Sequence, residues 1–152
     1  MKKYLYSLGL VLVLGACTSE ESKVKTAAIE AARMRLHAQM REEIVKSVTG
    51  KDNLQKTAAH ILTEKAELEV SQFELKGNKA SVTVEIQVVP EKVRQTLIEI
   101  MAKLDEKKEK TFNVSNAIGL INQQLGLDDG SRDLMVYKLN LEKNKEWRVT
   151  EP

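Results

Sequence analysis

Side chains that could ligate a metal ion are few and widely spaced in this chain. The two histidines, His37 and His60, lie far apart in the sequence, and neither has a cysteine or an acidic residue at the spacing of a metal-binding motif. We therefore expect both imidazoles to lie at the surface or at the boundary of the core. The sequence predicts no bound metal and no cofactor.

The acidic stretch 128–133 is a second place where a cation could bind. It begins with Asp128, Asp129 and Gly130, as a calcium loop does, but the twelfth position counted from Asp128 is Leu139. An EF-hand needs a bidentate glutamate there. Because aspartate and glycine are also ordinary turn formers, the stretch predicts a loop.

Acid–base or nucleophilic chemistry has little support. Glu42 and Glu43 are adjacent in an expected helix and diverge, whereas Glu67 and Glu69 lie on the polar face of an expected strand. Ser115 stands near a helix start and is best explained as an N-cap. No Gly-x-Ser-x-Gly, P-loop or Gly-x-Gly-x-x-Gly motif occurs, so the sequence predicts a protein that is not an enzyme.

The single cysteine, Cys17, closes the only long apolar run of the chain. Two lysines precede this run, it carries no charge from residue 4 to residue 16, and polar residues follow it at once. This order is typical of the processing segment of an exported protein. The run is too short for a permanent transmembrane helix, which needs roughly 20 apolar residues. With one cysteine, no internal disulfide is possible.

The sequence Leu14-Gly15-Ala16-Cys17 resembles the lipobox of bacterial lipoproteins. The resemblance implies cleavage between Ala16 and Cys17, a diacylglycerol thioether on Cys17 and acylation of the new amino terminus. It divides the chain into a signal peptide (1–16), the lipidated cysteine with a short polar tether (17–23) and one domain (24–152). Thr18 is not the aspartate that favours inner-membrane retention in such lipoproteins. We therefore expect the periplasmic face of the outer membrane if the cell is Gram-negative.

The mature chain is balanced in charge, because the excess of +2 belongs to Lys2 and Lys3 of the signal peptide. Nucleic-acid binding needs a concentrated basic surface, so we expect no nucleic-acid partner. The 136 residues after the signal peptide suffice for one domain with its own core.

Hydrophobic periodicity predicts the order helix, helix, hairpin, helix, helix, hairpin. The expected third helix has Pro90 at its first position and an apolar seam of Val93, Leu97, Ile100 and Leu104, which Ile98 and Met101 widen. A change of phase near residues 71–72 predicts a β-bulge in the first hairpin. The segments are expected at 24–48, 52–63, 66–88, 90–110, 114–125 and 135–149.

This order predicts an α+β fold in which helices pack on an antiparallel sheet of about four strands. The ending Leu139 to Val149, in which a charged turn precedes Trp147-Arg148-Val149, resembles the last hairpin of small NTF2-like or cystatin-like lipoproteins. A tandem helix-helix-strand-strand repeat, as in proteinaceous inhibitors of the β-lactamase-inhibitor type, is the alternative.

Function is expected to be binding without catalysis: a lipid-anchored interaction module whose partners are the membrane, through Cys17, and an envelope protein. A carrier of a small apolar ligand is one alternative, because Met34, Met40, Met101 and Met135 are adaptable lining residues. An inhibitor or immunity protein for an envelope hydrolase is the other.

Overall fold

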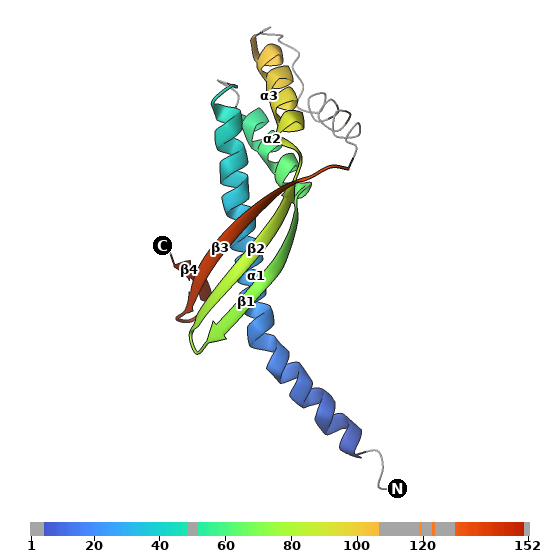
Figure 1. Ribbon diagram of the computed structural model, residues 1–152, viewed down its shortest axis with the longest axis vertical. Helices are drawn as coiled ribbons and strands as arrows, with labels where there is room; N and C mark the ends of the chain where they lie inside the picture. The colour runs from blue at the N-terminus through green and yellow to red at the C-terminus, as the bar shows by residue number, and fades with distance from the viewer. Residues whose placement is uncertain (1–4, 49–51, 107–118, 120–122, 124–129, 151–152) are drawn as a thin grey trace.

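The structure is a computed structural model that describes residues 5–48, 52–106, 119, 123 and 130–150. Within these residues the chain forms three helices and four strands (Figure 1). In chain order they are α1 (Leu5–Val45), α2 (Asp52–Glu64), β1 (Glu67–Lys76), β2 (Lys79–Val88), α3 (Glu91–Glu106), β3 (Asp133–Lys143) and β4 (Trp147–Thr150).

The strands form one antiparallel sheet in the order β1-β2-β3-β4. Both expected hairpins, β1–β2 and β3–β4, are present, and β2 and β3 pair along residues 79–88 and 133–142. This α+β architecture with a four-stranded antiparallel sheet confirms the expected fold class, and it is consistent with an NTF2-like or cystatin-like arrangement. Of the helix expected at 114–125, the structure describes only residues 119 and 123, and both are helical.

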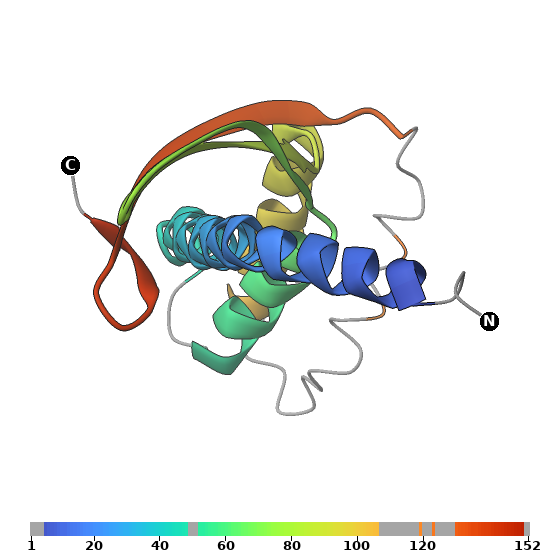
Figure 2. The same ribbon diagram turned by 90° about the horizontal axis from the view of Figure 1, so that it is seen from below.

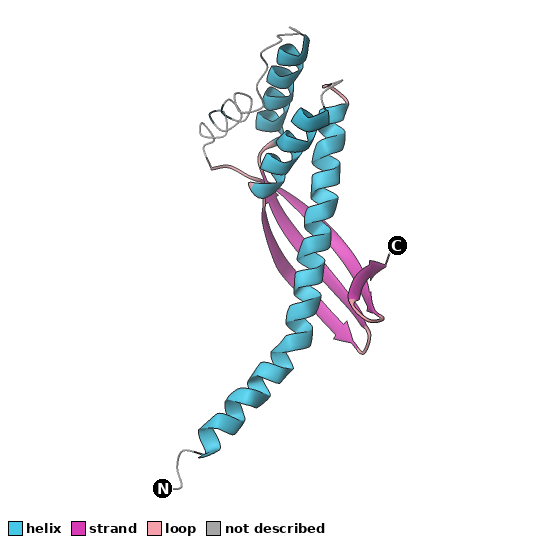
Figure 3. Ribbon diagram, turned by 180° about the vertical axis from the view of Figure 1, so that it is seen from behind, coloured by secondary structure: helices cyan, strands magenta, loops and turns pink. Residues whose placement is uncertain are grey.

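The helices lie on one side of the sheet. The sheet curves around α1, which crosses its concave face, and α2 and α3 lie beyond one end of the strands (Figures 2 and 3). Among the described elements none covers the convex face. This arrangement agrees with the strand patterns, since β2 alternates strictly between buried and more exposed residues.

A stripe of apolar side chains on α1 builds most of the core. Its members recur at every fourth position, and each is at most 1% exposed: Val24, Ala28, Ala32, Leu36, Met40, Ile44 and Val48, the third residue after the end of the helix. At 3.6 residues per turn, a four-residue repeat rotates by about 40° at each step. The stripe therefore winds around α1, so the helix can face the sheet in its middle and α2 near its end.

The β-bulge expected near residues 71–72 is confirmed. The β1–β2 register shifts between Val70 and Gln72, and the hairpin turns at Gly77, whose φ is +60°. Since side chains alternate along a strand, the bulge turns Phe73 back toward the core after Leu68 and Val70. Tyr137 and Trp147 are also buried and belong to the core.

Helix α3 differs from the expectation in its first residue and in part of its buried face. The carbonyl of Pro90 accepts the amide of Arg94, so Pro90 caps the helix and Glu91 is its first residue. The buried face consists of Arg94, Leu97, Ile98 and Met101, whereas Val93 and Ile100 are only half-buried. Apolar residues occupy more than one face of this helix, so spacing alone does not determine which face is buried.

The residues expected to form a short polar tether are part of a helix. Residues 18–23 are helical and belong to α1, which continues without a break from Leu5 to Val45. Val24 is fully buried, and Glu20 contacts the β3–β4 hairpin. The folded part of the chain therefore begins close to Cys17.

Candidate functional site: the outer edge of β3

Part of β3 forms an open edge of the sheet. β4 pairs only with residues Asn140 to Lys143 of β3, and the hydroxyl of Thr150 donates to the Asn140 carbonyl at 3.2 Å. Residues 133–139 pair with β2 on one side and with no described strand on the other. An open edge presents backbone N–H and C=O groups that can pair with an added strand.

Two large apolar side chains stand exposed on this segment. Leu134 is 62% exposed and Val136 is 48% exposed, and both lie on the convex face. Between them and after them, Met135, Tyr137 and Leu139 point to the core side. The run Leu134 to Tyr137 is therefore apolar on both faces, a pattern typical of strands that are covered on both sides.

Carboxylates lie on the convex face that carries these apolar side chains, and Lys138 lies on the same face two residues after Val136. Glu85 lies opposite Val136 on one side and opposite Glu69 on the other, and Glu67 lies one row away. All three are exposed, and none forms an ion pair within the described part of the chain. Like charges directly opposite each other destabilise a strand pair, so this face favours a cationic partner.

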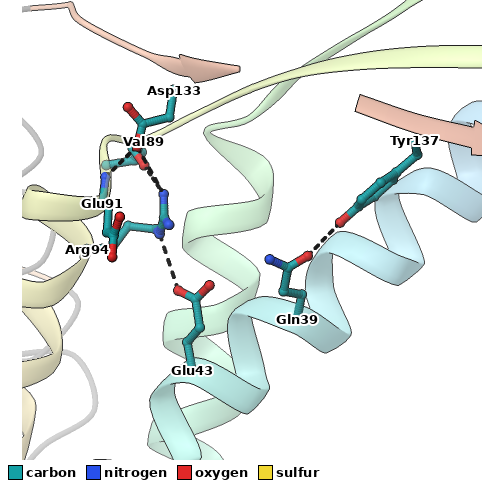
Figure 4. Close-up of polar contacts among 7 residues, drawn as sticks. All are labelled: Gln39, Glu43, Val89, Glu91, Arg94, Asp133 and Tyr137. Carbon is teal, nitrogen blue, oxygen red and sulfur yellow. Dashed lines mark hydrogen bonds and ion pairs between the residues drawn. The ribbon is translucent and has the colours of Figure 1, made fainter. Parts of the chain in front are cut away.

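The start of β3 is fixed by a polar cluster around Arg94, which is 8% exposed (Figure 4). Its guanidinium donates to the Val89 carbonyl at 2.6 Å and to Glu43 of α1 at 3.3 Å, and it lies 3.8 Å from Asp133. Asp133 also accepts the backbone amide of Glu91 at 2.7 Å. The cluster therefore joins α1, α3 and the ends of β2 and β3.

The middle of the open segment is fixed by Tyr137. Its hydroxyl donates to Gln39 of α1 at 2.9 Å (Figure 4), and the guanidinium of Arg35 lies 4.9 Å from the centre of its ring. Burial raises the pKa of this phenol, and Arg35 opposes the rise. Hydrogen bonds to the helices therefore fix the open segment of β3 at two residues, Asp133 and Tyr137.

The other end of β3 is joined to the start of the folded part of α1. Glu20 accepts hydrogen bonds from Lys143 at 2.8 Å, from the indole of Trp147 at 3.1 Å and from Lys23 at 3.4 Å. These donors, Lys143 first and Trp147 second, lower the pKa of Glu20 from 4.5 to about 2.

This shift gives the first testable prediction. Since the pKa of Glu20 is lower in the folded state, its contribution to stability is present above pH 4.5 and is lost as the pH falls toward 2. Glu20→Gln is expected to flatten the acid-induced loss of stability over that interval, measured by the fluorescence of Trp147, the only tryptophan. Glu146→Gln, which removes an exposed carboxylate 3.8 Å from Arg148, is the matched control. If the free energy of unfolding falls equally steeply with falling pH in Glu20→Gln and in the unsubstituted chain, the role assigned to Glu20 is contradicted.

The acidic residues singled out in the sequence lie apart from one another. Glu42 pairs with Lys46 and Glu43 with Arg94, so the two diverge as expected. Cys17 and Ala16 lie within α1. Ser115 and the first acidic residues of 128–133 lie outside the described residues, and Asp133 begins β3.

The two histidines line the same open hollow between α1 and α2. His37 is half-buried and His60 is exposed, as expected for surface or boundary residues. Sequence reasoning missed this pairing, because it depends on how two helices pack. It also missed Arg94 and the edge of β3, although Arg94 stands at helical spacing from Leu97 and Met101, and residues 134–137 form an unbroken apolar run.

Among the described residues, no group of three or more His, Cys, Asp or Glu side chains is arranged to hold a metal ion. None of the described helices combines the length and apolar character needed to cross a membrane. In comparisons with known proteins, the chain matches no family model, no curated protein and no solved structure.

Proposed function

We propose that this protein is a lipid-anchored interaction module of the cell envelope that binds an extended segment of an envelope protein along the open edge of β3. The observation that carries the proposal is the pairing of β3: residues 133–139 have an open edge, and Leu134 and Val136 lie exposed beside it. The module acts by binding its partner and not by catalysis. Its clusters of hydrogen bonds and ion pairs hold the helices and strands together.

The anchor part of the proposal is supported by the lipobox-like sequence that ends at Cys17. A chain cleaved before Cys17 carries lipid at the first residue, and Glu20, three residues later, is bonded to Lys143 and Trp147. Three residues of α-helix rise by about 4.5 Å. The lipid is thus attached within one helical turn of the folded domain, which confines the domain to the membrane surface.

The partner is expected to supply an extended segment in which apolar and basic side chains alternate. Its backbone pairs with residues 133–139, its apolar side chains cover Leu134 and Val136, and its cations lie near Glu85, Glu69 and Glu67. Backbone pairing supplies affinity in this mode, and the alternating side chains supply specificity. The bonds at Asp133 and Tyr137 reduce the entropic cost of binding, because the edge is already ordered.

The second prediction tests this edge. A photo-crosslinking amino acid placed at position 136 is expected to give one discrete adduct in the native envelope, and Leu134→Lys is expected to remove it, because edge lysines oppose strand addition. Position 149 is the matched control, since Val149 is an exposed valine on β4, outside the open segment. In hydrogen exchange, the amides of 133–139 are expected to slow when the captured partner is added back.

Two results would overturn the proposal: no adduct from position 136, or an adduct that persists unchanged in Leu134→Lys.

The two alternative functions, a ligand carrier and an inhibitor or immunity protein, predict other outcomes. A carrier of small apolar ligands would retain a ligand in native mass spectrometry of protein from its host. An inhibitor or immunity protein would yield an adduct with an envelope hydrolase. The structure favours neither, because Met40 and Met101 are buried in the core and Met34 is exposed, so these side chains line no common pocket.

A further inference from the structure

We propose that Met34, His37 and His60 form a surface site for a soft monovalent metal ion of the copper(I) class. The three residues line one open hollow of about 450 Å³ between α1 and α2. Nothing in the interaction-module proposal uses this hollow, which is built by the two helices and not by the sheet.

The packing of α1 against α2 sets the two imidazoles at the same level. The helices run antiparallel, and Arg33 lies 3.5 Å from both the Thr63 carbonyl and Glu64. A second contact joins the helices further along. Arg41, which lies two helical turns after Arg33 on α1, is 2.6 Å from Asp52, which lies about three turns before Glu64 on α2. His37 lies one turn beyond Arg33 on α1, and His60 lies one turn before Glu64 on α2. The two contacts therefore bracket the histidine pair.

Met34 places a thioether beside this pair. It precedes His37 by three residues on α1, and side chains at that spacing lie about 5–6 Å apart at Cβ on the same helix face. Its side chain is 75% exposed, the highest value among the exposed large apolar side chains of the described chain. The sulfur of Met34 is therefore not packed in the hydrophobic core.

The chemistry of the donors selects the ion. A thioether is a soft ligand that favours copper(I), and imidazole also binds copper well. Glu30 and Glu64 also line the hollow, but among the described residues no group of three His, Cys, Asp or Glu side chains is arranged to hold a metal ion. Glu64 forms an ion pair with Arg33, and its carboxylate offsets the positive charge that this arginine brings to the hollow. We therefore expect copper(I) to bind in preference to zinc or calcium.

The experiment is an anaerobic titration of the full-length lipidated protein in detergent with copper(I), in competition with bicinchoninate. One equivalent is expected to bind. His60→Gln and Met34→Leu are each expected to weaken binding at least about tenfold, since even partners outside the first shell of metal sites typically contribute that much. Met101→Leu, at a buried methionine of α3 that does not line the hollow, is the matched control and is expected to bind as the unsubstituted chain does. Thermal unfolding is expected to be unchanged in Met34→Leu and His60→Gln, because both side chains are exposed.

Each possible result of the titration either supports the site or overturns it. Loss of copper(I) uptake in His60→Gln and Met34→Leu, with unchanged unfolding, supports the site. Absence of uptake, or uptake that neither substitution weakens, overturns it. A free thiol at an unlipidated Cys17 would bind copper(I) and would produce the second of these results, so lipid mass at Cys17 is measured on the same sample. Failure of this site leaves the β3 edge proposal intact, because the two surfaces share no residue.

Discussion

Arg94→Met is expected to lower the free energy of unfolding by about 2–3 kcal/mol, because it leaves the partners of a buried guanidinium without a cation or a donor. The Glu43 side chain is only 25% exposed, and the Val89 carbonyl loses its 2.6 Å hydrogen bond. Methionine retains most of the aliphatic packing of the arginine stem, so the change isolates the polar contacts. Urea unfolding followed by Trp147 fluorescence measures the effect.

The control for this prediction is Arg148→Met. Arg148 also pairs with a glutamate, at 3.8 Å, but its side chain is 80% exposed, so the loss is expected to stay within about 0.5 kcal/mol. Adding Glu43→Leu to Arg94→Met is expected to restore part of the stability, because no uncompensated charge then remains buried. A loss below about 0.5 kcal/mol in Arg94→Met alone would contradict the role assigned to the cluster. Faster exchange of the β3 amides next to Asp133 is expected in the same variant, since the cluster fixes this end of the strand.

Cys17→Ser is expected to abolish lipid attachment completely, because serine has no thiol to form the thioether. Each buried methylene contributes roughly 0.8 kcal/mol to membrane binding, and one myristoyl chain alone binds only marginally. Three acyl chains, the number that the lipoprotein resemblance implies, would hold the protein to a bilayer effectively permanently. Mass spectrometry of the detergent phase is expected to find an unsubstituted chain that begins at Cys17 and carries the lipid mass.

The readout for Cys17→Ser is the mass and the amino terminus rather than the membrane fraction. A variant that keeps residues 1–16 retains their apolar run and can remain with membranes without lipid. Ser19→Ala is the matched control, since it changes a nearby hydroxyl and leaves the cysteine in place. An unsubstituted mature chain that begins at another residue, or that lacks lipid mass, would refute the anchor proposal.

Local patterns in the sequence predicted much of the sheet and the first helices. The β1–β2 hairpin, its bulge near Val70 and its turn at Gly77 follow from a period of two and from turn residues, which constrain the backbone within a few positions. The buried stripe of α1 and the buried position of Tyr137 follow for the same reason. The lipobox-like sequence at Cys17 is also a local signal, and it stays a prediction.

Tertiary structure decided which distant segments meet. The β2–β3 pairing joins segments separated by residues 89–132, and the choice among such pairings depends on the energy of the whole sheet. The burial of Arg94 depends on Glu43, Val89 and Asp133, which come from three other parts of the chain. The proximity of His37 and His60 and the open edge of β3 arise in the same way, from packing and pairing between elements. The sequence by itself therefore determined the period and the buried faces of most elements, whereas the candidate site and the histidine pair exist only because the elements assemble in this register.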